Sequence, residues 1–160
     1  MISTSQLKKA VADRKVLIDS NIIIYLTDSV DPYQTLAKLL FQMVEAGDAE
    51  AVISILSVGE VMQGPIIHNQ DGLALEVKDY LVNFPNCRCQ EITLGVLDKV
   101  GGDRTIDWKK LRTVDSLIIA SGLVNGVDHF ISNDRHFLKA IPRPMMLSFD
   151  SQSLPDKYSG

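Results

Sequence analysis

Four acidic residues are the side chains best suited to chemistry, because each stands at the edge of an apolar segment. Asp19 directly follows the apolar run 16–18, and Glu60 and Asp134 come after two further apolar runs, whereas Asp115 lies where an apolar helical segment opens. Strand ends and helix starts share one edge of a parallel sheet, so we expect the four carboxylates to face a common crevice. Like charges brought together raise one another's proton affinity. We therefore expect this group either to stay apart or to bind a divalent cation.

The ligand chemistry of this group indicates a hard cation. Carboxylate oxygens without cysteine or histidine ligands favour Mg²⁺ or Mn²⁺, with one or two ions bound. Such ions promote phosphodiester hydrolysis by activating water and stabilising the leaving oxygen. The sequence contains no P-loop lysine motif, no GxGxxG turn and no GxSxG elbow that would indicate another chemistry. The acids therefore predict metal-dependent hydrolysis of phosphodiesters.

Each acid also has a purely structural interpretation. Asp19 and Asp134 can be helix N-caps, and Asp115 in a first turn complements the helix dipole. Glu60 has the strongest structural interpretation, because Ser57-x-x-Glu60 has the pattern of a capping box. Only the expected convergence of all four carboxylates favours a functional site over four separate caps.

The elements that must position these acids alternate along the chain. Strands are predicted at 15–19, 51–56, 87–92, 127–132 and 145–149, with helices at 4–13, 33–46, 72–84, 94–100 and 114–124 and shorter helical segments after Asn21, from Ser57 and from Asn133. This alternation indicates βαβ units with right-handed crossovers. We predict a three-layer α/β/α sandwich with a mostly parallel, about five-stranded central sheet. One domain is expected over residues 1–150, followed by a flexible tail at 151–160.

Composition limits the class of protein. The 160 residues are 46% hydrophobic and 22% charged, as in an ordinary folded domain. A formal net charge of −4 argues against an indiscriminate nucleic-acid binder but does not exclude a nuclease. The N-terminus lacks an apolar signal region, and no segment is long and apolar enough to cross a bilayer, so we expect no membrane association and a cytoplasmic location. Cys87 and Cys89 are expected on one face of a strand as reduced, small apolar residues.

Four segments together resemble the PIN-domain nucleases and are most similar to their VapC-type toxin ribonucleases. They are Val16-Leu17-Ile18-Asp19-Ser20-Asn21, residues 57–64, residues 114–120 and residues 130–137. The resemblance covers about residues 15–149 and rests on the order and spacing of all four acids. It implies a parallel sheet with helices on both sides, Mg²⁺- or Mn²⁺-dependent cleavage of RNA, a homodimer, and often a partner antitoxin.

The resemblance also assigns roles to particular residues. Asp19, Glu60, Asp115 and Asp134 match the acidic tetrad of the family, which implies that they are catalytic and ligate the metal. Ser20, Asn21 and Ser132 match the small polar positions that orient the acids or the metal's waters, and Asn133 is grouped with them as the neighbour of Asp134. Residues 108–112 do not align with the family and residues 65–84 are not diagnostic, which leaves the target RNA and the partner undetermined.

Basic residues near the acids are candidates for contacts with the RNA backbone. They are Arg104, Lys109, Lys110, Arg112 and Arg135. A solvated loop would carry the same charges, so the two interpretations have equal weight. Trp108 can stack on a base, but a place in the core is favoured. His136 is a weaker candidate for a general acid, since a surface helix start has the same residue types.

Three other functions remain open. The first is an RNA-processing PIN nuclease without an antitoxin, and the second is a non-catalytic PIN-like scaffold that binds a partner or RNA. The third is a haloacid-dehalogenase-like phosphatase with Asp19 as nucleophile. That mechanism needs a second acid two residues after the nucleophile, where this chain has Asn21.

Overall fold

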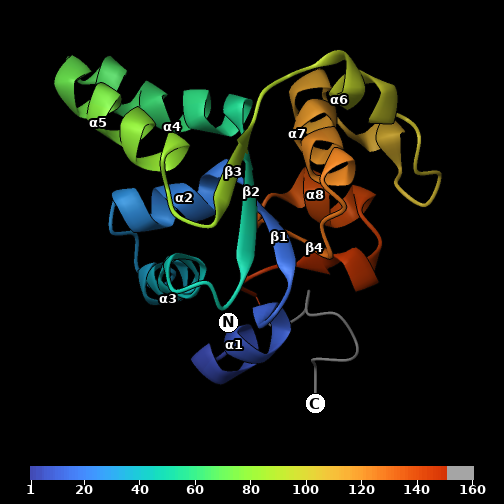
Figure 1. The fold of residues 1–160 in the computed structure, drawn as a ribbon, viewed down its shortest axis with the longest axis horizontal. Helices are drawn as coiled ribbons and strands as arrows, with labels where there is room; N and C mark the ends of the chain where they lie inside the picture. The colour runs from blue at the N-terminus through green and yellow to red at the C-terminus, as the bar shows by residue number, and fades with distance from the viewer. Residues whose placement is uncertain (151–160) are drawn as a thin grey trace.

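A parallel five-stranded sheet forms the centre of the molecule in the computed structural model, which describes residues 1–150 (Figure 1). The strands are β1 (Lys15–Ile18), β2 (Glu50–Ser54), β3 (Cys87–Gln90), β4 (His129–Ile131) and β5 (Met146–Leu147). Their order across the sheet is β3-β2-β1-β4-β5, and every neighbouring pair is parallel. β1 therefore lies in the middle, between β2 and β4.

Helices cover both faces of the sheet (Figure 1). One side carries α1 (Thr4–Val11), α2 (Ser20–Thr27), α3 (Gln34–Glu45), α4 (Ile55–Ile67) and α5 (Asp71–Val82), and the other carries α6 (Leu94–Lys99), α7 (Thr113–Val124) and α8 (Arg135–Ala140). Two 3-10 helices, η1 (Trp108–Lys110) and η2 (Arg143–Met145), lie in the connections before α7 and β5. The predicted three-layer α/β/α fold with a parallel sheet is confirmed.

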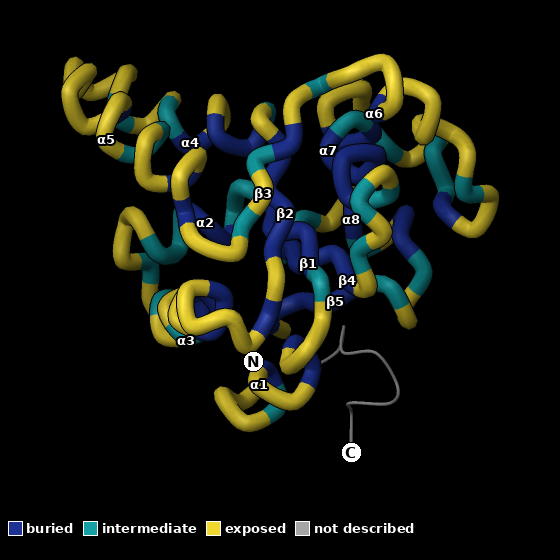
Figure 2. The backbone as a smooth tube through the Cα atoms, in the orientation of Figure 1, coloured by how far each residue is buried: buried dark blue, intermediate teal, exposed yellow. Residues whose placement is uncertain are grey.

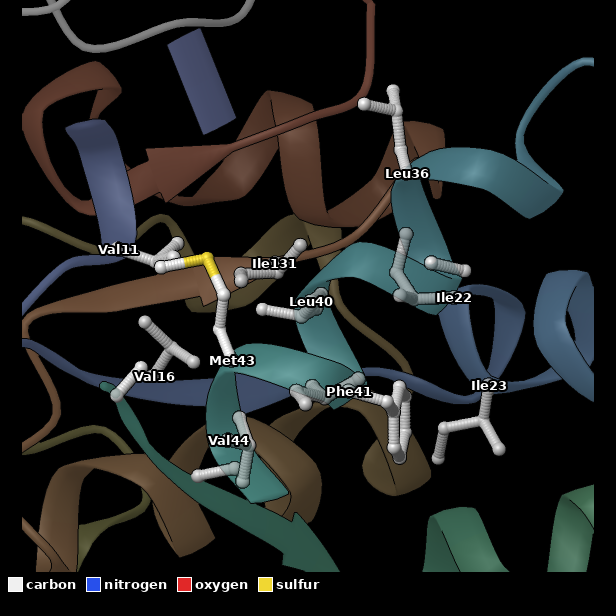
Figure 3. Packing of buried hydrophobic residues seen from close by; sticks show 14 of the residues in the cluster. Val11, Val16, Ile22, Ile23, Leu36, Leu40, Phe41, Met43, Val44 and Ile131 are labelled. Atoms are coloured by element: carbon white, nitrogen blue, oxygen red, sulfur yellow. The ribbon is translucent and has the colours of Figure 1, made fainter. Parts of the chain in front are cut away.

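The strands read as continuous apolar runs because both of their faces are buried. Successive residues of a strand point to opposite faces, so Val16 and Ile18 join the core beneath α1, α2 and α3, whereas Leu17 joins the core beneath α7 and α8. Figure 3 shows Val16 and Ile131 of the sheet beside Leu40 and other apolar residues of α3. In Figure 2 the central strands are largely buried and the outer helix surfaces are exposed. Such double burial is typical of parallel sheets.

Helix α7 packs unusually close to the sheet at Gly122. A Cβ atom placed on this residue would lie 2.6 Å from Cε1 of Phe130 and 3.1 Å from Cδ1 of Leu17. Only a glycine lets the helix backbone approach β1 and β4 this closely. The same helix carries Asp115 in its first turn, so this contact sets the height of that carboxylate above the sheet edge.

Several element boundaries differ from the prediction. β2 ends at Ser54, whose side chain accepts a hydrogen bond from the Leu56 amide and caps α4. Ser57 is therefore inside the helix, and the predicted Ser57–Glu60 capping box is wrong. Ile55 and Leu56 are apolar and fit a strand, so the predicted strand was two residues too long and the start of α4 was not recognised. The last strand is also shorter than predicted, with two residues in β5.

Three further expectations concern the cysteines, membrane-spanning segments and the C-terminal tail. Cys87 and Cys89 are free, half-buried thiols in β3, as predicted, and burial raises the pKa of Cys87 to about 12, so this thiol stays protonated. Over residues 1–150, no helix has the length and apolar character needed to cross a membrane. The predicted tail, residues 151–160, lies outside the described residues.

Candidate active site

Four elements bring the predicted acids to one edge of the sheet. Asp19 follows β1 and is the N-cap of α2, Asp134 precedes α8 after β4, and Asp115 is the third residue of α7. Glu60 lies on α4, the helix that follows β2. Burial is the largest cause of the raised pKa of both Asp19 and Glu60, and neighbouring acids add to it. Glu60 and Asp134 act on Asp19, and Asp115 and Asp134 act on Glu60. The four carboxylates are therefore electrostatic neighbours, although they come from widely separated parts of the chain.

Asp19 is the most deeply buried of the four, with 4% of its surface exposed. Its Oδ1 accepts a hydrogen bond from the Ser20 amide at 2.8 Å, and its Oδ2 accepts from the Ser132 hydroxyl at 2.7 Å and from Asn21 Nδ2 at 3.3 Å. Burial raises the pKa of Asp19 from 3.8 to about 6, against the lowering effect of the bonds from Ser132 and Ser20. The carboxylate is held rigidly and is close to its titration point near neutral pH.

Ser132 and Asn21 join the ends of β1 and β4. The Ser132 hydroxyl accepts from the Asp134 amide at 3.0 Å and from Asn21 Nδ2 at 3.1 Å while it donates to Asp19. Asn21 Oδ1 accepts from the Asn133 amide at 3.2 Å. Asp134 in turn caps α8, since its Oδ1 accepts from the His136 amide at 2.7 Å. One small network therefore fixes the positions of Asp19 and Asp134 relative to each other.

The Asn133 side chain bonds to structural partners rather than to the acids. Its Oδ1 accepts from the Ser148 hydroxyl at 2.6 Å and from the Phe149 amide at 2.9 Å, and its Nδ2 donates to Tyr25 Oη at 3.2 Å. It therefore ties the loop that carries Asp134 to the end of β5 and to α2. Tyr25 and Ser148 were not among the predicted residues, because no local pattern marks such long-range partners.

Glu60 occupies the exposed rim of the group. Partial loss of water around its carboxylate is the main cause of its raised pKa, followed by the charges of Asp115 and Asp134. A hydrogen bond with the Ser20 side chain and the positive charge of Arg112 act in the opposite direction. Without the capping box, no helix cap accounts for this glutamate, whereas Ser20 links it to the end of β1.

Asp115 is 4% exposed and is paired with Arg112. Its Oδ2 accepts from the Arg112 amide at 3.2 Å and from Arg112 Nε at 3.0 Å, and its Oδ1 accepts from Nη2 at 3.3 Å. This pairing raises the pKa of Arg112, with further contributions from Asp134 and Glu60. A guanidinium cation therefore lies among the acids.

The donor set suits a divalent ion, although it is not gathered into a finished coordination sphere. Within residues 1–150, no three histidine, cysteine, aspartate or glutamate side chains are close enough to hold a metal together. The four acids offer only carboxylate oxygens, the ligands that Mg²⁺ and Mn²⁺ prefer. Asp19 and Asp134 are oriented by Ser132, and Asp115 by its own helix start. The chemistry of these side chains therefore fits a hard cation, and Arg112 bonds to both oxygens of Asp115 in this structure.

The remaining predicted residues have no contact with the four acids among the interactions described for residues 1–150. Lys109 and Arg135 are exposed, as is Arg104, and Lys110 forms an ion pair with Asp107 at 3.4 Å. Trp108 packs against the core beneath α7 and donates its Nε1 hydrogen to the Asp103 carbonyl at 2.7 Å. This tryptophan is half-buried against the core, which agrees in part with the favoured placement in the core.

Comparisons with known proteins agree with the fold. The chain matches the PIN domain family over residues 16–141. Among solved structures, it resembles VapBC2 from Rickettsia felis bound to a promoter DNA fragment, with 16% identity, a TM-score of 0.60, and coverage of 85% of this chain and 99% of that chain. A toxin-antitoxin complex from Klebsiella pneumoniae gives 21% identity, a TM-score of 0.58, and coverage of 82% and 95%.

A third solved structure is VapC20 from Mycobacterium tuberculosis, described as a toxin that cleaves the sarcin-ricin loop. It gives 12% identity, a TM-score of 0.57, and coverage of 76% of this chain and 92% of that chain. No curated protein matched the sequence. At these identities the solved structures establish the fold, and the family match confirms the resemblance found in the sequence.

Proposed function

The chain belongs to the PIN domain family, a family of nucleases, and we propose that it is a divalent-cation-dependent endoribonuclease that hydrolyses RNA phosphodiester bonds. The proposed catalytic and metal-binding residues are Asp19, Glu60, Asp115 and Asp134. The observation that supports this function best is the position of the acids at the carboxyl edge of the parallel sheet, where Ser132 joins Asp19 to Asp134.

The chain's own residues prepare this site for a phosphodiester. A bound Mg²⁺ or Mn²⁺ supplies Lewis-acid charge that activates water and stabilises the leaving oxygen. Ser132 and Asn21 hold the Asp19 carboxylate in one orientation, which limits reorganisation during the reaction. Glu60, exposed and with a raised pKa, either ligates the cation or accepts a proton from the attacking water.

Replacement of Asp19 by asparagine tests the proposal. We expect Asp19→Asn to reduce cleavage of a single-stranded RNA in Mn²⁺ by more than the about 10–100-fold that is typical of a residue supporting a ligand. Asp79→Asn is the matched control, because it removes the same charge from an exposed position on α5. Cleavage by purified Asp19→Asn at the wild-type rate, with host nucleases excluded, would refute the assignment.

We infer further that the protein acts as a toxin with an antitoxin partner. The support is the similarity of fold to VapBC and toxin-antitoxin complexes. Expression of the wild type is expected to arrest growth, whereas Asp19→Asn is not. A neighbouring small reading frame whose product co-purifies with the chain would identify the antitoxin. Growth that continues under wild-type expression would favour an RNA-processing nuclease instead.

The other proposals concern assembly and the alternative chemistries. A homodimer is tested by the mass of the purified chain in light scattering. A calorimetric titration without Mn²⁺ or Mg²⁺ binding would favour a non-catalytic scaffold. The phosphatase alternative is disfavoured by Asn21, whose amide bonds to Asp19 Oδ2 and Ser132 but cannot serve as a general acid.

A further inference from the structure

Arg112 places a positive charge where a bound cation would be expected. Its guanidinium bonds to both oxygens of Asp115, through Nε at 3.0 Å and Nη2 at 3.3 Å. The same charge interacts favourably with Asp134 and Glu60. Arg112 therefore bonds to one of the acids, and its charge offsets part of the repulsion among three of them in the protein without a metal.

The Arg112 guanidinium is well placed to leave this position. The Arg112 side chain is 68% exposed, whereas the Asp115 side chain is 6% exposed. Among the described residues, Asp115 is the hydrogen-bond partner of the guanidinium. An ion pair with one partner this open to water contributes little to stability. The guanidinium therefore bonds to Asp115 in a defined geometry but can be displaced from it at little cost.

Departure of the guanidinium would leave Asp115 oriented. The Arg112 backbone amide also donates to Asp115 Oδ2, at 3.2 Å, and this bond belongs to the helix start rather than to the arginine side chain. A released guanidinium remains beside the acids and can bind a phosphate with two parallel hydrogen bonds, a geometry that lysine does not provide.

From this arrangement we propose that Arg112 is a resident counterion that competes with the divalent cation for Asp115 and, once displaced, binds a phosphate of the RNA. This inference rests on the proposed nuclease function. The Arg112 side chain has two successive partners, first Asp115 and then a phosphate of the RNA. Cation binding is the event that frees Arg112 for the substrate. Substrate binding is thereby coupled to occupation of the metal site.

Titration with Mn²⁺ alone tests the first half of the proposal. Arg112→Gln removes the charge while keeping the backbone amide bond, and we expect it to bind Mn²⁺ about two- to fivefold more tightly, the factor that corresponds to an exposed ion pair. Arg112→Lys, which keeps the charge without the paired hydrogen bonds, is expected to fall between Arg112→Gln and the wild type. Lys38→Gln, an equal charge change at an exposed position on α3, is the control and should shift the affinity less.

The outcomes separate this inference from the nuclease proposal. Tighter Mn²⁺ binding by Arg112→Gln supports the counterion role, because a merely structural loss would weaken binding. Equal or weaker binding by this variant, with normal binding by the wild type, refutes the counterion role and leaves the nuclease proposal intact. Absence of Mn²⁺ binding in every variant refutes both.

Kinetics at saturating Mn²⁺ test the second half. If the freed guanidinium holds a phosphate, Arg112→Gln raises the KM for RNA several-fold with a smaller effect on kcat. Lys38→Gln, the same charge change on α3, should have a smaller effect on KM. An unchanged KM in Arg112→Gln would refute the phosphate contact.

Discussion

Asp19 is expected to lower the stability of the metal-free protein, because its charge is buried. The pKa of this carboxyl is about 6 in the folded protein against 3.8 as the ordinary value. At about 1.4 kcal/mol per pKa unit, the ionised side chain destabilises the fold by about 3 kcal/mol. Asp19→Asn removes this penalty and keeps a capping oxygen, but its amide nitrogen replaces Oδ2, which accepts hydrogen bonds from Ser132 and Asn21. The loss of this acceptor costs about 1 kcal/mol. The variant should therefore be about 2 kcal/mol more stable at pH 7.5.

The pH dependence of this effect has a definite sign. Because the folded state holds the Asp19 proton more tightly than the unfolded chain, the free energy of unfolding falls as the pH rises from about 3.8 to about 6. The destabilisation by ionised Asp19 reaches its full value above about pH 6 and is about 1 kcal/mol at pH 4.5. At pH 4.5 the gain and the loss of the Oδ2 acceptor nearly cancel, so the variant and the wild type should have similar stability.

Urea unfolding in EDTA at pH 7.5 and pH 4.5 measures both values. Asp79→Asn is the control and should stay within about 0.5 kcal/mol of the wild type at each pH. Saturating Mn²⁺ should reverse the order at pH 7.5, since a ligand at 100 times its Kd stabilises the folded wild type by about 2.7 kcal/mol. A difference between Asp19→Asn and the wild type that is the same at both pH values would refute the reasoning.

Two further substitutions test the packing and the network around the site. Gly122→Ala should destabilise the protein by about 1–3 kcal/mol in urea unfolding, because its Cβ would meet the Phe130 ring. Gly59→Ala, with open space around its Cβ on α4, should instead stabilise it by up to about 1 kcal/mol. Ser132→Ala should raise the pKa of Asp19 further, because it removes the hydroxyl that donates to this carboxylate. RNA cleavage should fall by about 10–100-fold, and its pH profile should move to higher pH. An unchanged profile would contradict the role given to the Ser132 hydroxyl.

Much of the fold was predictable because local patterns and burial agree. The run at 16–18 is apolar on both faces and ends at an acid, which identifies β1 and the position of Asp19. The start of α4 was not predictable in the same way, because Ser54 and Ser57 are equally good caps and the apolar residues between them fit a strand as well as a helix. Tertiary contacts decided between them, since Ser54 also lies at hydrogen-bond distance from Ser121 of α7.

The site divides into a predictable part and an unpredictable part for a similar reason. The convergence of the acids follows from parallel topology, which the alternation of strands and helices indicates. Arg112 and Asp115 are three residues apart at the start of a helix, a spacing that brings opposite charges together. Their ion pair was therefore predictable from the sequence. The bonds of Asn133 to Tyr25 and Ser148 join three separate elements, and no local pattern encodes such contacts.

The capping and catalytic interpretations of the acids are complementary rather than exclusive. Asp19 and Asp134 each use Oδ1 to accept an amide at the start of a helix, and Asp115 accepts the amide that precedes α7. Amides and the positive ends of helices favour negative charge, which partly offsets the repulsion among carboxylates. The hydrogen bond from Ser20 acts in this direction, since it lowers the pKa of the buried Asp19. Helix capping thus helps to keep the acids ionised and oriented, the state that a divalent cation requires.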